Sequence, residues 1–186
     1  MQAAAVILAA GASTRFGSPK QLARIGDRTM LETVVELAVA AGLAPIIAVL
    51  PPGLAPPSGV IPVVNADPDA GLSRSLRMGI AAVPVEVGSA VILLGDQPTV
   101  SIRTLEALLE VAAVTERPVV AAHATGRIGP PVVLSRAAFE LAEAATGDEG
   151  LRRLLDESPH LVATVEVGEH ALDVDTPADL ATLADR

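Results

Sequence analysis

Short, wholly apolar runs recur along the chain, and each is too short to form an ordinary helix. They are rich in Val, Ile, Leu and Ala, with no polar position that would mark a solvent-facing side. Runs of this kind are typical of parallel strands that are buried on both faces of a sheet. We therefore predict strands over residues 4–8, 46–50, 60–64, 90–94 and 119–122.

The segments between these runs have the pattern of amphipathic helices. Thr29 followed by Glu32 matches a capping box, and apolar residues recur at helical spacing over residues 31–38. Further helix starts are predicted at Ser73, Ser101, Ser135 and Thr176-Pro177. Alternating strands and helices predict an α/β fold: a Rossmann-like, doubly wound, mainly parallel sheet with helices on both faces. We expect residues 1–186 to form one domain.

The composition excludes several classes of function. The chain has no cysteine, which excludes thiolate catalysis, cysteine-ligated metal sites and disulfides. The net charge of −9 and the presence of only two aromatic residues argue against a nucleic-acid partner, which needs a basic surface and often aromatic rings. The apolar start of the chain lacks the basic region of a secretory leader, and no apolar run reaches the length of a membrane span. We expect a cytoplasmic protein.

Charge is unevenly distributed along the chain. Residues 1–80 carry six basic and five acidic side chains, so the net negative charge lies entirely in the rest of the chain. An acidic protein with a near-neutral first half is suited to hold one small anionic ligand there. Chance unevenness on a solvated surface is the alternative.

The segment after the first predicted strand has the composition of a phosphate-binding loop. Small residues let the backbone turn close to a ligand, so that successive N–H groups can bind phosphate oxygens. Arg15 and Lys20, the chain's only lysine, would add positive charge. The spacing matches neither a Walker A loop nor a GxGxxG fingerprint, and an ordinary glycine–serine loop is the alternative. The predicted nucleotide-binding residues here are Leu8, Ala9, Ala10, Gly11, Ala12, Ser13, Arg15 and Lys20.

Carboxylates stand at two further positions that a nucleotide would approach. Asp96 follows the strand predicted over 90–94, and a carboxylate there suits Mg²⁺, which prefers oxygen ligands. Asp173 and Asp175 precede the Thr176 cap, at the end of what reads as a short strand. A turn role for Asp96, and a helix-start role for the other two acids, are the alternatives.

Weaker candidates lie elsewhere. Asn65 follows the strand predicted over 60–64, and Ser73 and Ser75 offer hydroxyls near a helix start. Residues 126–131 and 147–150 read as loops, and the three histidines lack the spacing of metal ligands.

Five motifs together resemble one family. They are Leu8-Ala9-Ala10-Gly11-x-Ser13-x-Arg15-x-Gly17-x-x-Lys20-Gln21-Leu22, Gly71-Leu72-Ser73-x-Ser75-Leu76-x-x-Gly79, Leu94-Gly95-Asp96-Gln97-Pro98, Gly147-Asp148-x-Gly150-x-Arg152 and Asp173-Val174-Asp175-Thr176-Pro177-x-Asp179-Leu180. In this order they resemble the molybdenum cofactor cytidylyltransferases within the MobA-like NTP transferases, whose fold is that of the nucleotide-diphospho-sugar transferases. The Ala9-Ala10-Gly11 form resembles the cytidylyl branch more than the guanylyl branch. The chain departs from the family pattern at 67–70, which lacks an aromatic residue, and at 129–132, which has proline where His or Asn is frequent.

The resemblance implies transfer of a nucleotidyl group from an NTP, with CTP favoured, to a phosphorylated acceptor. The acceptor it implies is the molybdopterin cofactor, and a molybdoenzyme or its maturation factor is the implied protein partner. Lys20 and Arg15 would bind the triphosphate, and Asp96 and Asp175 would hold Mg²⁺. Asn65, Ser73 and Ser75 would contact base or ribose, while Arg127 and Arg152 would meet the acceptor's phosphate or form ordinary surface salt bridges. Another small phosphorylated acceptor, or a binding role without turnover, are the other possibilities.

Overall fold

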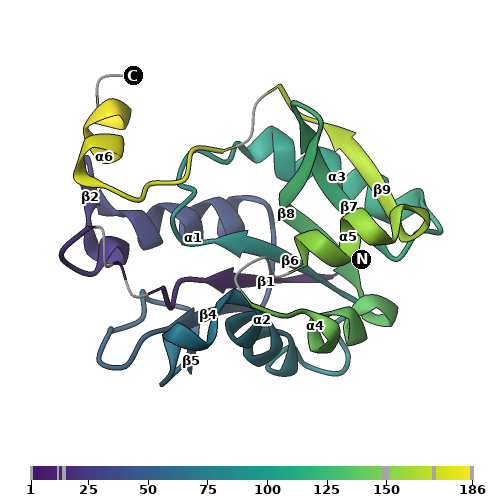
Figure 1. The fold of residues 1–186 in the computed structure, drawn as a ribbon, viewed down its shortest axis with the longest axis horizontal. Coiled ribbons are helices and arrows are strands. Elements are labelled where there is room, and N and C mark those ends of the chain that lie inside the picture. Colours follow the sequence, from purple (N-terminus) through teal and green to yellow (C-terminus); the bar gives the residue numbers. More distant parts are fainter. Residues whose placement is uncertain (1, 12, 14–15, 148–150, 169–170, 185–186) are drawn as a thin grey trace.

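A seven-stranded sheet forms the centre of the computed structural model (Figure 1). The structure describes the chain except for residues 1, 12, 14–15, 148–150, 169–170 and 185–186. The strand order is β5-β4-β1-β6-β8-β7-β9, and only β8 runs antiparallel to its two neighbours. The strands are β1 (Ala3–Leu8), β4 (Ile46–Leu50), β5 (Ile61–Val64), β6 (Ser89–Leu94), β7 (Val119–Ala124), β8 (Arg127–Ser135) and β9 (Val162–Glu166).

Helices cover both faces of this sheet, as predicted. In Figure 1, α2 and α4 lie on one side of it and α1 and α3 on the other. The buried residues form two clusters, one against α2, α4 and α5 and one against α1 and α3. The helices are α1 (Met30–Ala40), α2 (Leu72–Ala81), α3 (Ile102–Val114), α4 (Glu140–Ala144), α5 (Arg152–Glu157) and α6 (Pro177–Ala184), and Arg24–Ile25 and Arg28–Thr29 form the small hairpin β2-β3.

Strand β1 is buried on both sides because it lies between β4 and β6. Successive side chains point to opposite faces, so Val6 packs in one cluster and Ile7 in the other, both fully buried. Helix α2 approaches β1 closely at Gly79, where an added Cβ would lie 2.4 Å from Cγ1 of Val6. The glycine therefore sets the distance at which α2 packs over the sheet.

Two strand predictions were wrong. The strand predicted over 60–64 was expected to be buried, but β5 is the edge of the sheet, and Ile61 and Val64 are about half exposed. Residues 126–131 were predicted to be a loop, but β8 begins at Arg127. This strand lies between β6 and β7, which therefore do not pair with each other.

The predicted helix starts were partly right. The capping box of Thr29 and Glu32 is present, and the Ser101 hydroxyl accepts a hydrogen bond from the N–H of Thr104. Ser73 does not cap α2, because that helix begins one residue earlier, after Gly71. Ser135 is the last residue of β8 and caps nothing with its side chain.

None of the helices in the described part of the chain is both long and apolar enough to cross a bilayer.

Candidate active site

A cavity of about 450 Å³ lies where β1 and β6 end. Its lining includes the segment from Leu8 to Gly11 after β1, Gly95 and Asp96 after β6, and Leu72 and Ser75 of α2. The carboxyl ends of parallel strands are the usual ligand-binding edge of such a sheet. We call this the nucleotide cavity, after the ligand that the sequence motifs predict for it.

A buried glutamine holds the loop after β1 in place. The Nε2 atom of Gln21 donates hydrogen bonds to the carbonyl oxygens of Ala9, at 2.8 Å, and Gly11, at 3.1 Å. The hydroxyl oxygen of Ser13 accepts a hydrogen bond from the N–H of Lys20 at 3.1 Å. These contacts hold the segment in a turn, and Ala9, Ala10 and Gly11 line the cavity. The sequence reasoning gave Gln21 no role, although its place beside the lone lysine was visible.

The loop after β6 packs directly against the loop after β1. The N–H of Gly95 donates to the carbonyl oxygen of Leu8 at 2.9 Å. An added Cβ on Gly95 would lie 2.6 Å from Cβ of Ala9 and 3.2 Å from its Cα. Only glycine fits this approach without moving one of the two loops, so Gly95 fixes Asp96 relative to the loop after β1.

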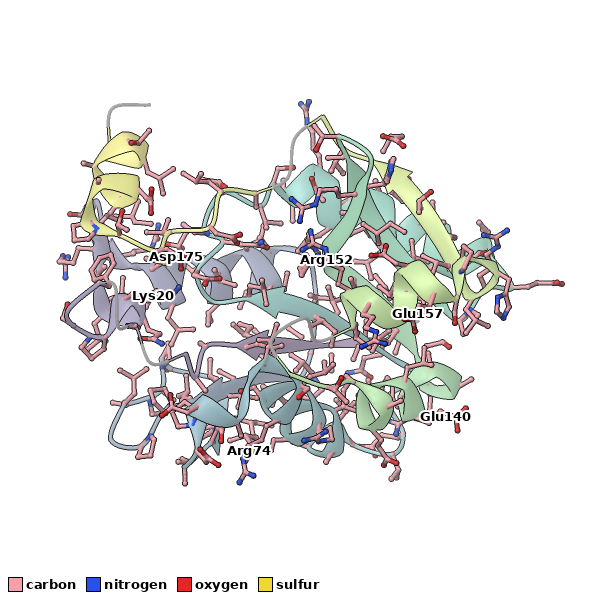
Figure 2. The ribbon with its side chains drawn as sticks, viewed as in Figure 1. Lys20, Arg74, Glu140, Arg152, Glu157 and Asp175 are labelled. Atoms are coloured by element: carbon pink, nitrogen blue, oxygen red, sulfur yellow. The ribbon has the colours of Figure 1, made fainter. Side chains whose placement is uncertain are left out.

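Lys20 bridges the two carboxylates that were predicted to hold a metal. Its Nζ lies 2.7 Å from Oδ2 of Asp96 and 2.8 Å from Oδ1 of Asp175. Figure 2 shows Lys20 and Asp175 beside each other. The lysine side chain is 13% exposed, and burial alone would lower its pKa. The attraction and hydrogen bonds of the two carboxylates outweigh that effect and raise the pKa of Lys20 above its usual value, so the group is a fixed cation.

The segment before α6 carries Asp175 across the sheet edge to this cluster. The N–H of Val174 donates to the carbonyl oxygen of Asp96 at 2.9 Å, and the Val174 side chain is fully buried. Thr176 then caps α6, because its hydroxyl oxygen accepts from the N–H of Asp179. The predicted helix start is confirmed, but the described residues 171–175 before it do not form the short strand that was expected.

Asp173 and Gln97 form a second polar pair beside this cluster. Nε2 of Gln97 donates to Oδ1 of Asp173 at 2.8 Å, and Gln97 is buried. Partial desolvation raises the pKa of Asp173, and the nearby charges of Asp96 and Asp175 add to this effect. The sequence placed Asp173 among the carboxylates near a bound nucleotide but gave it no role as a metal ligand, and it gave Gln97 no role.

The candidates for base or ribose contacts are placed differently from one another. Ser75 lines the nucleotide cavity, whereas Asn65 and Ser73 do not. Asn65 is fully buried and bonded within the protein, since its Nδ2 donates to the hydroxyl of Ser75 and its Oδ1 accepts from Nε of Arg74. It ties the end of β5 to α2.

Arg127 and Arg152 both line a second cavity of about 370 Å³. This cavity shares lining residues Leu8, Leu72 and Leu94 with the nucleotide cavity, so the two adjoin. We call it the second cavity. Of the remaining candidates, Ala12 and Arg15 lie outside the described residues.

The described residues contain no group of three or more His, Asp or Glu side chains arranged to hold a metal. Asp96 and Asp175 supply two carboxylates that face one point, the position of the lysine ammonium. Two carboxylates are a ligand set that suits Mg²⁺ when substrate phosphates and water complete its coordination.

Comparison with known proteins identifies the family. The profile of the MobA-like NTP transferase domain matches residues 5–163, and the chain belongs to this family. It is therefore related to nucleotidyltransferases. It is also 34% identical over 116 residues to the bifunctional protein GlmU of Hyphomonas neptunium. That match covers 58% of this chain and 25% of the relative, so the chain spans about a quarter of the curated protein it matches.

Solved structures share the fold over its full length. The chain is similar to Rv0371c from Mycobacterium tuberculosis H37Rv, with 31% identity, full coverage of both chains and a TM-score of 0.85. A structure of Rv0371c in complex with manganese gives 31% identity, a TM-score of 0.83, and coverage of 100% and 99%. A CMP:2-keto-3-deoxy-manno-octonic acid synthetase complexed with CTP is 18% identical, with a TM-score of 0.77 and coverage of 100% and 98%, and shares the fold.

Proposed function

We propose that this MobA-like NTP transferase uses Mg²⁺ to transfer CMP from CTP to the molybdenum cofactor, on its molybdopterin phosphate, and releases pyrophosphate. The observation that carries the proposal is the position of Lys20, whose ammonium contacts Asp96 and Asp175 at the edge of the cavity that the loop after β1 encloses. A cation and two carboxylates beside a backbone cradle are the parts that a metal-bound triphosphate needs.

In this reaction an acceptor phosphate oxygen forms a bond to the α-phosphorus of CTP. The bond from that phosphorus to the bridging oxygen of the β-phosphate breaks, and pyrophosphate takes the electron pair. The nucleophile is already anionic, so the site needs positioning and charge neutralisation more than a general base. The N–H groups from Ala10 to Ser13 orient the phosphates, and Lys20 neutralises the charge that develops on pyrophosphate. Arg15 would add a second cation to the same phosphates.

Asp96 and Asp175 would hold the divalent ion. The fit follows from their geometry, because both carboxylates already face one cation at 2.7 and 2.8 Å. When bound, Mg²⁺ would supply positive charge that screens the phosphates from these acids. The manganese complex of Rv0371c supports a divalent-metal site in a protein of similar sequence.

The preference for CTP rests on the Ala9-Ala10-Gly11 form of the loop. Ser75, which lines the nucleotide cavity, would contact base or ribose, and Asn65 donates a hydrogen bond to its hydroxyl. Ser73 is the third residue proposed for such contacts. The acceptor would lie in the second cavity, near Arg127 and Arg152. A molybdoenzyme or its maturation factor would then receive the product in the cytoplasm.

Two other functions fit the family. One keeps the reaction and changes the acceptor to another small phosphorylated molecule. The other is a cofactor-binding chaperone without turnover, and the ion pairs of Lys20 with Asp96 and Asp175 speak against it, because binding alone has less need of metal-binding carboxylates.

The test is a pyrophosphate-release assay that combines each of four NTPs with the molybdenum cofactor and a panel of other phosphorylated acceptors. We expect CTP with molybdenum cofactor to give the highest rate, and Asp96→Asn to lower it by about 10²-fold, the usual cost of one electrostatic stabiliser. Glu36→Gln, which removes an exposed carboxylate paired with Arg28, is the matched control. A preference for GTP would place the protein in another branch of the family. A rate of pyrophosphate release that Asp96→Asn leaves unchanged would contradict the assignment of Asp96 to the active site.

A further inference from the structure

Gln21 uses every polar atom of its side chain on the loop after β1. The side chain is 2% exposed, and its amide offers two N–H donors and one carbonyl acceptor. Both donors are used, on the carbonyl oxygens of Ala9 and Gly11. Its Oε1 accepts a hydrogen bond from the hydroxyl of Ser13 at 3.4 Å. Contacts to two successive carbonyl groups fix the direction of the loop's peptide groups as well as the position of the loop.

The hydrogen bond from Gln21 to Ala9 sets the direction of the next N–H. In a trans peptide, the C=O and the N–H that follows it point in opposite directions. The carbonyl oxygen of Ala9 faces Gln21, so the N–H of Ala10 faces the opposite side of the chain. That side is the side of β6, because the carbonyl oxygen of Leu8 also faces it and accepts there from the N–H of Gly95. Gly95 lines the nucleotide cavity, as does Ala10 itself.

Ala10 has a buried backbone donor with no partner among the described residues. It is 2% exposed, and no oxygen in the described part of the chain accepts a hydrogen bond from its N–H. The N–H of Ala9, by contrast, donates to the carbonyl oxygen of Val49. Buried backbone donors are nearly always paired, so an open donor at a cavity wall points to an oxygen atom of a ligand.

The same contacts connect the loop to the lysine of the site. Lys20 and Gln21 are neighbours in the short 3-10 helix over Lys20–Leu22. The hydroxyl oxygen of Ser13 accepts from the N–H of Lys20, while its proton is donated to Gln21. Ser13 has a backbone φ of 54°, in the left-handed region that is unfavourable for residues other than glycine. These hydrogen bonds hold Ser13 in that conformation, so the loop and Lys20 form one unit beside the nucleotide cavity.

We infer that Gln21 is a positioning residue for the triphosphate. By holding the carbonyl oxygens of Ala9 and Gly11 behind the loop, it keeps the N–H of Ala10 directed at the phosphates. The inference rests on the proposed function and adds to it a residue that acts through the loop. Without the two donors of Gln21, a peptide of the loop can rotate and turn its carbonyl oxygen towards the phosphates. An attraction is then replaced by a repulsion between two negative groups.

Binding of Mg²⁺–tripolyphosphate tests the inference without nucleoside, acceptor or turnover. In calorimetric titrations, we expect Gln21→Met to weaken the affinity by about 10- to 100-fold, the effect of losing one charge-assisted hydrogen bond. Gln21→Glu has nearly the shape of the wild-type side chain but no N–H donor, so it should weaken binding at least as much. Gln97→Met is the matched control, because Gln97 is also buried but donates to Asp173 instead of the loop. We expect the control to keep the wild-type affinity.

The amide resonance of Ala10 reports the same event directly and needs no variant. In the wild type, its proton signal should move downfield as tripolyphosphate binds, because the open N–H gains an acceptor. In folded Gln21→Met this shift should be lost, whereas a purely structural role of Gln21 would leave it in place. Wild-type affinity in Gln21→Met, equal weakening in Gln97→Met, or an Ala10 signal that does not respond in the wild type would each overturn the inference. If the wild type binds tripolyphosphate through Ala10 but releases no pyrophosphate in the NTP assay, only the proposed function fails.

Discussion

Replacing Lys20 by methionine should tighten metal binding to the free protein even as it abolishes turnover. In the structure the ammonium occupies the point that Asp96 and Asp175 both face, at 2.7 and 2.8 Å. A divalent ion at this point must displace at least one of these charge-assisted hydrogen bonds, each worth about 1.5–3 kcal/mol. At about 1.4 kcal/mol for each tenfold change, Lys20→Met is expected to lower the dissociation constant for Mn²⁺ by about 10- to 100-fold.

The assay is a titration of nucleotide-free protein with Mn²⁺, with the unbound ion followed by electron paramagnetic resonance. Arg28→Met is the matched control, since it removes an exposed cation from the same half of the chain and leaves the carboxylate pair untouched. Lys20→Arg keeps the positive charge, so its side chain should still compete with Mn²⁺ for the two carboxylates. If Lys20→Met binds Mn²⁺ no more tightly than the control, the ammonium does not compete for the carboxylates and the reasoning fails.

The same geometry predicts cooperation between metal and nucleotide. A triphosphate offers the ammonium new partners, so its arrival frees Asp96 and Asp175 for the ion. In the wild type, a non-hydrolysable CTP analogue should therefore tighten Mn²⁺ binding, and Mn²⁺ should tighten analogue binding by the same factor. In Lys20→Met the carboxylates are already free, and most of this coupling should disappear.

Gly95→Ala would bring a methyl group to 2.6 Å from Cβ of Ala9, so we expect it to shift the loop after β1 and lower kcat/KM for the NTP by about tenfold or more, the effect expected of a displacement of about 1 Å. Gly168→Ala, where the space is open, should leave the rate unchanged, and equal rates for both variants would contradict the loop packing. Asp173→Asn keeps an acceptor for Gln97 and removes a charge that folding disfavours, since the pKa of Asp173 is raised in the folded state. An acid whose pKa is raised on folding stabilises the folded state below its pKa in the unfolded chain, about 3.9, and this stability is lost as the pH rises through the pKa in the folded state. The variant should therefore have a higher Tm than the wild type at pH 7 and the same Tm at pH 3. Thermal unfolding measures both Tm values, and a Tm difference between variant and wild type that is the same at pH 3 and pH 7 would refute this assignment of charge to Asp173.

The parts of the fold that sequence predicted are those with strong local signals. The apolar runs of β1, β4 and β6 and the capping box of α1 depend on neighbouring residues alone, and the structure has them close to the predicted positions. The edge position of β5 depends on what pairs with it, which no local pattern reveals.

Strand β8 was missed because its prolines read as a loop. The ladder with β7 shifts register between Ala121 and Ala122, and the paired residues of β8 jump from Val132 to Gly129. Pro130 and Pro131 fall in the interruption, where a residue without an N–H costs the sheet no ladder hydrogen bond. A central strand thus tolerates a sequence that normally marks a turn.

The site residues likewise divide into those that local motifs reveal and those whose contacts depend on the folded chain. The phosphate-loop composition and the acid after β6 were visible as local motifs, and they lie together at one cavity. The contact of Lys20 with Asp175, 155 residues away in sequence, depends on the whole sheet and on the backbone hydrogen bond between Val174 and Asp96. The role of Gln21 could not be read either, because it bonds to carbonyl oxygens whose direction only the folded loop defines.

The charges of the assembled site give a physical reason for the divalent ion that we propose. One ammonium and two carboxylates make the Lys20 cluster net negative, and Asp173 stands beside it. A triphosphate that approached this cluster without a counterion would meet repulsion that the loop N–H groups offset only in part. A divalent ion held by Asp96 and Asp175 would reverse the sign of the cluster and leave Lys20 available to the phosphates. In the proposed reaction the lone lysine of this acidic chain would therefore have two successive partners. It contacts both carboxylates in the free protein, and it would pair with the leaving pyrophosphate when metal and nucleotide bind together.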